Sequence, residues 1–363
     1  MSSTSQHIPT HMPTHIPTHM RAMLLTGFGG TDKLQYRDDV PVPTPGPHQV
    51  LIEVGACGVN NTDVWTREGA YGASEEAGWQ GSAFTFPRIQ GMDAVGRIVA
   101  LGQGVPPERL GQRVMVNPTL YAPVAGPASL FQATYLGSEF DGGFAQYLCL
   151  PDSNAHAVNT PLSDAELATF MTSYMTAQHM LNRAQLAAGE TLLVPGASGG
   201  VGSALVQLAR IRGARVAVII GQDKAPTLQG LDVAAVMFRG EPDLAGQLQQ
   251  QLGRANVDVV ADLVAGEQVP QLLELLCDGG RYVTAGAIAG AMVTLDWRKI
   301  YLKHLSILGA TMGSQAESLQ IVDYVERGLL KPLLSATYAL KDLVQAQQDF
   351  KTRKHFGKLV MTI

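Results

Sequence analysis

The 363-residue sequence has few cysteines, no long apolar run and no strong excess of one charge. Its three cysteines are too few and too scattered for a disulfide framework or a structural four-cysteine zinc site. No window approaches the roughly 18 consecutive apolar residues of a membrane-spanning helix. The N-terminus lacks the basic patch and apolar core of a secretory signal. We therefore expect a cytoplasmic protein.

The charge balance also excludes some partners. Charged residues make up 16% of the chain, and the net charge of −5 gives no electrostatic case for binding nucleic acid or an anionic membrane. The hydrophobic content of 46% is ordinary for a folded soluble chain, and the length allows two domains with sizeable cores. We expect a small molecule as the substrate.

Residues 1–20 contain a four-residue repeat that spaces His7, His11, His15 and His19 equally. The intervening prolines forbid a helix, so the histidines do not share a helical face. A short histidine-rich tract can bind a soft metal ion. We favour the interpretation of a disordered tail.

Two patterns of secondary structure follow the tail. The first consists of short strands at irregular spacing with glycine-rich turns between them, which favours a small β-barrel-like domain. We expect these strands at 22–25, 34–37, 50–54, 91–101 and 113–116. A helical stretch at 164–185 leads to the second pattern.

In the second pattern, strands alternate with helix-length spacers, which indicates a parallel, doubly wound sheet. The near-continuous apolar runs fit strands that are covered on both faces. Strands are expected at 191–194, 216–220, 236–238, 257–263, 282–285 and 306–308. Helices at 318–328 and 341–351 and a last strand at 358–362 would return to the first domain.

The stretch 189–210 reads GETLLVPGASGGVGSALVQLAR and predicts a strand, a glycine turn and a helix. This arrangement presents backbone N–H groups and a helix N-terminus to a pyrophosphate. Gly199 and Gly202 would be the close-approach and helix-packing glycines, and Ala197 takes the place of the first glycine. An ordinary tight turn without a ligand is the alternative.

The same spacing, G-E-x-x-L-x-x-x-A-S-G-G-x-G-x-x-x-x-Q-x-x-R, resembles the signature of quinone oxidoreductases. These enzymes are the zeta-crystallin-like branch of the medium-chain dehydrogenase/reductase superfamily, and the resemblance extends over about 21–363. It implies an α/β fold with a GroES-like β-barrel catalytic domain and a Rossmann dinucleotide-binding domain. The catalytic domain would be discontinuous, at 21–155 and 313–363, with the Rossmann domain at 156–312.

The positions that resemble the catalytic zinc ligands of this superfamily carry other residues. The segment 58–63, GVNNTD, resembles G-V-C-H-T-D with Asn60 at the cysteine, and 91–93, GMD, resembles G-H-E with Met92 at the histidine. The third ligand falls near Thr172. Amide, thioether and hydroxyl groups do not hold Zn²⁺ against competing ligands in water. We predict no zinc, although a cluster of Cys57, Cys149 and His156 is a weak alternative without a metal-binding spacing.

Three residues are candidates for catalysis. The resemblance places Thr62 at the hydroxyl proton relay of alcohol dehydrogenases and Tyr71 at a tyrosine that lines the substrate cleft. Asn60 would point into the vacated metal pocket and donate from its amide. On purely structural grounds, Thr62 also suits a helix cap and Asn60 a turn.

The resemblance and the strand order imply the residues that bind the cofactor. Gly221 after the second strand leaves room for a 2′-phosphate, which Lys224 and Arg239 would bind, so NADP is preferred over NAD. Asp223 is the counter-evidence, because a one-residue shift would make it a ribose ligand. The expected cofactor-binding residues are Asn61, Thr176, Ala197, Ser198, Gly199, Gly200, Val201, Gly202, Gly221, Gln222, Lys224, Phe238, Arg239, Gly286, Ala287, Ile288 and Lys358.

These expectations favour a zinc-independent, NADP(H)-dependent reductase of quinones or α,β-unsaturated carbonyls. Without a metal, hydride delivery is easiest to an acceptor that is already electrophilic. A metal-free alcohol, aldehyde or enoyl-thioester reductase and a non-catalytic NADPH-binding protein are the alternatives. The apolar segment 306–312 resembles an edge strand that pairs across a two-fold axis, so we expect a homodimer or a higher homo-oligomer.

Overall fold

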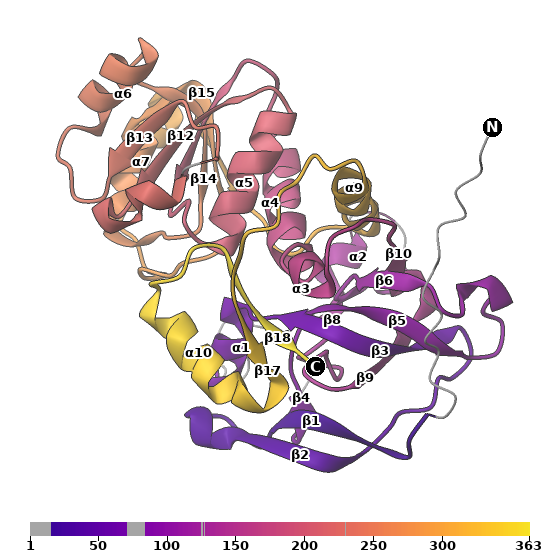
Figure 1. Ribbon diagram of the computed structural model, residues 1–363. Coiled ribbons are helices and arrows are strands. Elements are labelled where there is room, and N and C mark those ends of the chain that lie inside the picture. Colours follow the sequence, from indigo (N-terminus) through magenta and orange to yellow (C-terminus); the bar gives the residue numbers. More distant parts are fainter. Residues whose placement is uncertain (1–15, 71–83, 125, 127, 229) are drawn as a thin grey trace, which may run out of the picture.

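The computed structural model describes residues 16–70, 84–124, 126, 128–228 and 230–363. They form two lobes, each built on a sheet, with helices α4 (Met171–Arg183) and α5 (Gly200–Ile211) between the sheets (Figure 1). The C-terminal strands lie beside strands from the N-terminal half (Figure 1). The lobe that these strands share is therefore discontinuous in sequence.

The first lobe holds a seven-stranded sheet in the order β10-β6-β5-β3-β18-β17, with β9 paired to β3. A smaller sheet, β2-β1-β4, and the pair β7-β8 complete the lobe. Its strands are β1 (His19–Leu25), β2 (Leu34–Pro41), β3 (Gln49–Gly58), β4 (Arg88–Ile89), β5 (Asp93–Leu101), β6 (Arg113–Val116), β7 (Thr119–Leu120), β8 (Thr134–Tyr135), β9 (Tyr147–Pro151), β10 (Ala155–Ala157), β17 (Leu334–Ala339) and β18 (Lys358–Thr362). Its helices are α1 (Asn61–Arg67), α2 (Ala128–Phe131), α3 (Asp164–Leu167) and α10 (Leu343–Thr352).

The second lobe is a six-stranded parallel sheet in the order β13-β12-β11-β14-β15-β16. The strand order reverses between β11 and β14, and ligands of such sheets bind beside this reversal at the carboxyl ends of the strands. Its strands are β11 (Thr191–Pro195), β12 (Arg215–Ile220), β13 (Ala235–Phe238), β14 (Val257–Asp262), β15 (Leu276–Thr284) and β16 (Ser306–Gly309). Helices α6 (Leu244–Leu252), α7 (Val269–Glu274), α8 (Trp297–Leu302) and α9 (Gln315–Glu326) join α4 and α5 around it.

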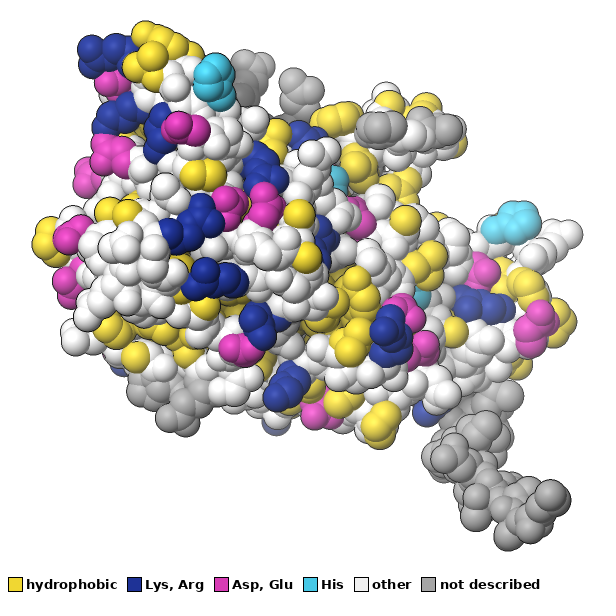
Figure 2. Space-filling view, turned by 90° about the horizontal axis from the view of Figure 1, so that it is seen from above, with side chains coloured by type: hydrophobic (Ala, Val, Ile, Leu, Met, Phe, Trp, Pro, Cys, Tyr) yellow, Lys and Arg dark blue, Asp and Glu magenta, His cyan; other side chains and the backbone are white. Residues whose placement is uncertain are grey.

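These two architectures confirm the predicted fold class. In β12, all but the first residue are buried, as expected of a parallel strand covered on both faces. Lysine, arginine, aspartate and glutamate side chains are interspersed over the face drawn in Figure 2. No helix in the described part of the chain is long and apolar enough to cross a bilayer.

The predicted tail extends too far. His19 and Met20 belong to β1, and Met20 packs in the core of the first lobe, so the strand starts before residue 21. Strand β10 pairs with β6 and crosses the proposed boundary at residue 155. Helix α9 packs on α4 and adds Ile321 and Val325 to the core cluster that contains the parallel strands.

The predicted helix over 164–185 is two helices. Helix α3 ends at Leu167 and α4 begins at Met171. The Thr169 hydroxyl donates to the carbonyl of Glu166 in the break. At the start of α4, the backbone N–H of Thr172 donates to Asp93 Oδ1 at 2.7 Å. The break therefore directs the Thr172 N–H, in the first turn of α4, toward a buried carboxylate of the other lobe.

Candidate functional site

A cleft of about 720 Å³ lies between the lobes. Its walls come from α1, the N-terminal ends of α4 and α5, the loops after β14, β15 and β16, and the segment 353–358. The predicted residues that line it are Asn60, Asn61, Thr62, Thr176, Ser198, Gly199, Gly200, Val201, Gly202, Arg239, Gly286, Ile288 and Lys358.

The glycine turn between β11 and α5 has the geometry of a phosphate cradle. A Cβ at Gly202 would lie 2.4 Å from the carbonyl oxygen of Gly196, so this position requires glycine for the helix to pack on the strand. A Cβ at Gly199 would meet only the Gly196 oxygen, at 3.8 Å, and Gly199 caps the N-terminus of α5. The cleft therefore meets bare backbone at the positive end of a helix, which suits an anionic group.

A buried carboxylate shapes the opposite side of this turn. Asp262 at the end of β14 accepts hydrogen bonds from the N–H groups of Val264 and Ala265, at 2.7 and 3.1 Å. The Tyr282 hydroxyl also donates to Asp262, at 2.6 Å, and burial raises the pKa of Tyr282 far above its usual value. Ala265 has a φ of 54°, a conformation that is uncommon outside glycine. These bonds hold Val264 and Ala265 in the cleft wall.

Four polar side chains meet at the end of the cleft nearest α1. Lys358 Nζ donates to Asn60 Oδ1 at 2.5 Å and to Asp93 Oδ2 at 2.9 Å. Asn60 Nδ2 donates to the same Asp93 oxygen at 2.9 Å, and the Thr172 hydroxyl donates to the other oxygen. Asp93, at 1% exposed, is inside the protein, whereas the other three line the cleft.

Asp63 adds a second buried carboxyl beside this group. It accepts a hydrogen bond from the backbone N–H of Asn60 at 2.7 Å, which helps to begin α1. Burial raises the pKa of Asp63 to about 7, against the opposing effects of that hydrogen bond and of Lys358. Burial, with Asp63 and Asp93 nearby, also raises the pKa of Cys57 well above its usual value, so this thiol is a poor nucleophile.

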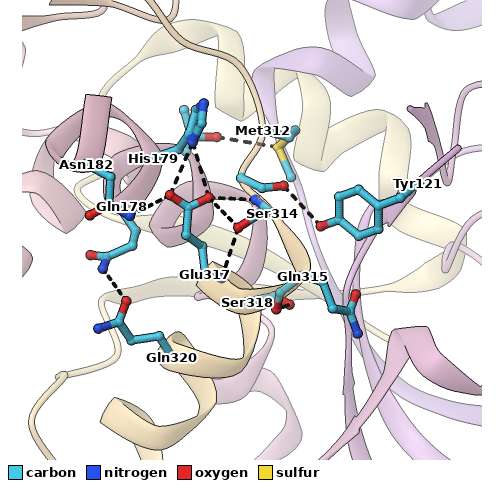
Figure 3. Close-up of polar contacts among 12 residues, drawn as sticks. Tyr121, Gln178, His179, Asn182, Met312, Ser314, Gln315, Glu317, Ser318 and Gln320 are labelled. Atoms are coloured by element: carbon cyan, nitrogen blue, oxygen red, sulfur yellow. Dashed lines mark hydrogen bonds and ion pairs between the residues drawn. The ribbon is translucent and has the colours of Figure 1, made fainter. Parts of the chain in front are cut away.

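The cleft wall that includes Thr311 and Met312 is tied to α4 and α9 through the residues that follow it (Figure 3). Glu317 accepts hydrogen bonds from Asn182 and from the backbone N–H of Ser314, both at 2.6 Å, and faces His179 Nδ1 at 3.2 Å (Figure 3). Burial raises the pKa of Glu317, but the bonds from His179 and Ser314 outweigh it and lower the pKa to about 2. The Thr176 hydroxyl contacts Met312 Sδ at 3.4 Å, so the predicted Thr176 lies at this wall.

Six of the predicted cofactor residues do not line this cleft. Ala197 is fully buried under the turn, and Ala287 packs against a core cluster of the second lobe. Three others lie toward the ends of β12 and β13, namely Gly221, Gln222 and Phe238. Lys224 is also outside the lining; its ammonium donates to the carbonyl oxygens of Lys354 and His355, at 2.5 and 3.2 Å. Lys224 therefore joins the two lobes.

Several residues of the cleft were not predicted. Arg353 and His355 follow α10 and line the cleft, and burial lowers the pKa of His355. Tyr135 and Thr311 face the cleft from β8 and from the segment after β16. Local sequence patterns carry no signal for these positions, because each depends on a contact between lobes. The predicted Tyr71 lies outside the described residues.

The donor set near α1 does not fit Zn²⁺. Asn60, Met92 and Thr172 line the cleft, but none of them is a usual zinc ligand, and the lysine ammonium beside them repels a cation. Within the described ranges, no three histidine, cysteine, aspartate or glutamate side chains lie close enough to hold a metal ion.

Comparison with known proteins identifies both lobes. Residues 46–160 match the alcohol dehydrogenase GroES-like domain, and residues 231–361 match the zinc-binding dehydrogenase domain. A quinone oxidoreductase of Lama guanicoe is 30% identical over 353 residues, covering 95% of this chain and 98% of the relative. An NAD-dependent alcohol dehydrogenase of Sulfurisphaera tokodaii is 29% identical, covering 94% of this chain and 99% of the relative.

The same architecture occurs among solved structures. A protein of Sinorhizobium meliloti described as an alcohol dehydrogenase is 48% identical and superimposes with a TM-score of 0.91. The match covers 97% of this chain and 98% of the other. The similarity therefore extends over both lobes and the cleft between them.

Proposed function

Because the chain belongs to the medium-chain dehydrogenase/reductase superfamily, in its quinone oxidoreductase-like branch, we propose that this oxidoreductase reduces quinones or α,β-unsaturated carbonyl compounds with NADPH and without zinc. The observation that carries the proposal is one cleft that contains both a glycine turn at the N-terminus of α5, which suits a phosphate, and a polar end where the positions that resemble zinc ligands carry Asn60, Met92 and Thr172. The bound cofactor would supply the hydride.

The polar end of the cleft suits an acceptor that is already electrophilic. Hydride addition moves an electron pair onto the acceptor oxygen, where conjugation spreads the charge, so hydrogen bonds give enough stabilisation. Thr62 lies in the first turn of α1 and lines the cleft beside Asn60. We assign Thr62 as a donor to the acceptor oxygen. The prediction that Asn60 donates into the pocket is wrong, because its amide nitrogen donates to Asp93 and to the Gly58 carbonyl and its oxygen accepts from Lys358. Asn60 therefore helps to position Lys358.

The proposed preference for NADPH rests on two arginine side chains that line the cleft near the ends of β13 and α10. Arg239 follows β13 and lines the cleft, and Arg353 lines it from the other lobe. Two guanidinium groups favour a ligand with an additional phosphate. The bond of Lys224 to two carbonyls leaves Arg239 as the principal candidate for the 2′-phosphate.

A single panel of assays tests the proposal. NADPH and NADH oxidation is followed at 340 nm with quinones, enones, aldehydes and enoyl thioesters, with and without EDTA. We expect turnover with a quinone or an enone, and no loss of rate with EDTA. Turnover confined to aldehydes or thioesters, or loss of activity with EDTA, would contradict the proposal.

The cofactor preference has its own test. The Arg239→Ala variant should raise the KM for NADPH by more than about 10-fold, because one charge-assisted contact to phosphate is lost. The KM for NADH should change by less than about 2-fold, since NADH has no 2′-phosphate. An equal effect on both cofactors would show that Arg239 does not discriminate between them.

The remaining expectations form part of the same proposal. We propose a cytoplasmic homodimer that pairs through the outer edge of β16, where Ile307 is 44% exposed and no second strand pairs in the described structure. Trp297 and Tyr301 of the neighbouring α8 are 69% and 61% exposed. An apolar strand edge of this kind is usually covered in a native protein.

A further inference from the structure

Lys358 is the first residue of β18, which is the fifth strand in the order of the seven-stranded sheet. Lys358 is only 4% exposed. Burial of a lysine is costly unless its charge is compensated and its hydrogen atoms find acceptors. The compensation comes from Asp93, at 2.9 Å, and one hydrogen bond goes to Asn60. A lysine in such a position is not needed for packing, since an apolar side chain would fill the same place at lower cost.

Lys358 lines the cleft, and its ammonium group has spare hydrogen-bonding capacity. Of its three N–H bonds, two have acceptors among the described residues, Asn60 Oδ1 and Asp93 Oδ2. The side chain itself lines the cleft. Its stem passes the phosphate turn, since a Cβ at Gly200 would lie 3.2 Å from Lys358 Cδ. The charge therefore lies between the turn and the N-terminus of α1.

The same contacts fix the direction of the Asn60 amide. Its oxygen accepts from Lys358 and its nitrogen donates to Asp93, so exchanging the two atoms would lose both bonds. Asp93 is held in turn by the N–H and the hydroxyl of Thr172. Asn60 and Thr172 are two of the positions that resemble zinc ligands, and Met92 precedes Asp93. Two of the positions that resemble zinc ligands thus belong to a hydrogen-bond network that contains the positively charged ammonium group of Lys358.

We propose that the Lys358 ammonium supplies the positive charge that a metal ion supplies in zinc-binding relatives. In this role, which rests on the proposed function, Lys358 stabilises negative charge on the acceptor oxygen through its third N–H. A hydride supplied by bound NADPH, which is thereby oxidised to NADP⁺, adds to the electrophilic carbon of the acceptor, and the displaced π-electron pair moves to the oxygen. Water then provides the proton that completes the product. Lys358 keeps its proton throughout and is not consumed.

The first test compares the wild type with Lys358→Met, using enones whose ring substituents grade their electrophilicity. At saturating NADPH, we expect the variant to lose about 100-fold in kcat/KM for the least electrophilic enone and less than about 10-fold for a strongly oxidising quinone, because such an acceptor needs little help. The dependence of rate on substituent should become steeper. The exposed Lys341→Met variant makes the same change of charge elsewhere and should behave as the wild type does.

The second test does not depend on turnover. In the presence of NADP⁺, p-nitrophenol is titrated by its absorbance at 400 nm as an oxyanion probe. The wild type should lower the pKa of the bound phenol by at least about 1 pH unit relative to Lys358→Met. If the wild type reduces no acceptor but still lowers this pKa, the proposed function fails while the role of Lys358 holds.

Two outcomes would overturn the inference. One is an equal loss of kcat/KM for all acceptors in Lys358→Met. A loss of rate that is present only below saturating NADPH has the same meaning, because it would make Lys358 a ligand of the cofactor phosphate. The other is an unchanged pKa of the bound phenol, or no binding of the phenol by the wild type. If Lys358→Met does not fold, the charge-neutral double variant Asp93→Asn with Lys358→Met replaces it. The side-chain oxygen of the introduced asparagine would still accept from Thr172, so this variant keeps that anchor of α4 and removes both charges, although the bonds made by Lys358 are lost.

Discussion

The raised pKa of the Asp63 carboxyl group leads to a specific prediction about how the stability of the protein depends on pH. Asp63 is 2% exposed, and its pKa is about 7 in the folded protein, against an ordinary value of 3.8. The folded state therefore binds a proton that the unfolded chain has lost over this range. The contribution of Asp63 to stability is full below about pH 4 and is lost as the pH rises through 7.

The size of the effect follows from the two pKa values. At about 1.4 kcal/mol for each pH unit, the difference between about 7 and 3.8 corresponds to about 4 kcal/mol between pH 4 and pH 8. In the Asp63→Asn variant, the side-chain oxygen still accepts from the Asn60 N–H, but the group does not ionise. The variant should therefore be more stable than the wild type at pH 8 and gain little or nothing at pH 4.

Urea denaturation of both proteins at pH 4.5, 6, 7 and 8 measures this difference in the free energy of unfolding. The exposed Asp38→Asn variant provides a control for the change in net charge. If the stability of Asp63→Asn minus that of the wild type is the same at pH 4.5 and pH 8, Asp63 is already ionised in the folded protein at pH 4.5. The reasoning from burial would then be wrong.

Three further predictions concern other parts of the molecule. Glu317→Gln should lower the free energy of unfolding by up to about 3 kcal/mol at pH 7, because the pKa of Glu317 is about 2 in the folded protein against an ordinary value of 4.5. In the wild type, the same stabilisation should be lost as the pH falls from about 4.5 to 2. Thermal unfolding of both proteins at pH 3 and pH 7 measures these two effects. Gly202→Ala should weaken NADPH binding by more than about 100-fold or prevent folding, because the added Cβ would lie 2.4 Å from the Gly196 oxygen. If a fluorescence titration gives an unchanged Kd for NADPH, the turn does not require glycine at this position. Ile307→Lys should convert the proposed homodimer to a monomer by placing a charge at the edge of β16, and light scattering after size-exclusion chromatography decides between the two states.

The fold was predictable because its signals are local. The bounds of β6 and β18 agree with the sequence pattern, and the strand, turn and helix around Gly199 follow from apolar periodicity and glycine content. The break between α3 and α4 was not predicted. Nothing in its composition distinguishes it from helix, since Thr172 is placed by a hydrogen bond to Asp93, 79 residues earlier.

The site was predictable only in part, for the same reason. Asn60 and Lys358 were both named as candidates, one for catalysis and one for cofactor binding, but their mutual contact was not foreseen. The bond of Lys224 across the lobes and the anchoring of Ala265 by Asp262 were also missed. Each depends on segments that the fold brings together from distant parts of the chain, and no periodic pattern records such a pairing.

The position of β18 has a consequence for the assembly of the enzyme during synthesis. Among the described residues this strand follows all the others in sequence, yet it lies between β3 and β17, and Lys358 is 298 residues from Asn60. A nascent chain on the ribosome would have both lobes nearly complete while the first sheet still lacked an interior strand. Contacts of such long sequence separation form slowly, because they require a large loss of chain entropy. Lys358 therefore reaches Asn60 only after β18 has been synthesised, and a chain truncated before β18 should be inactive however well its second lobe folds.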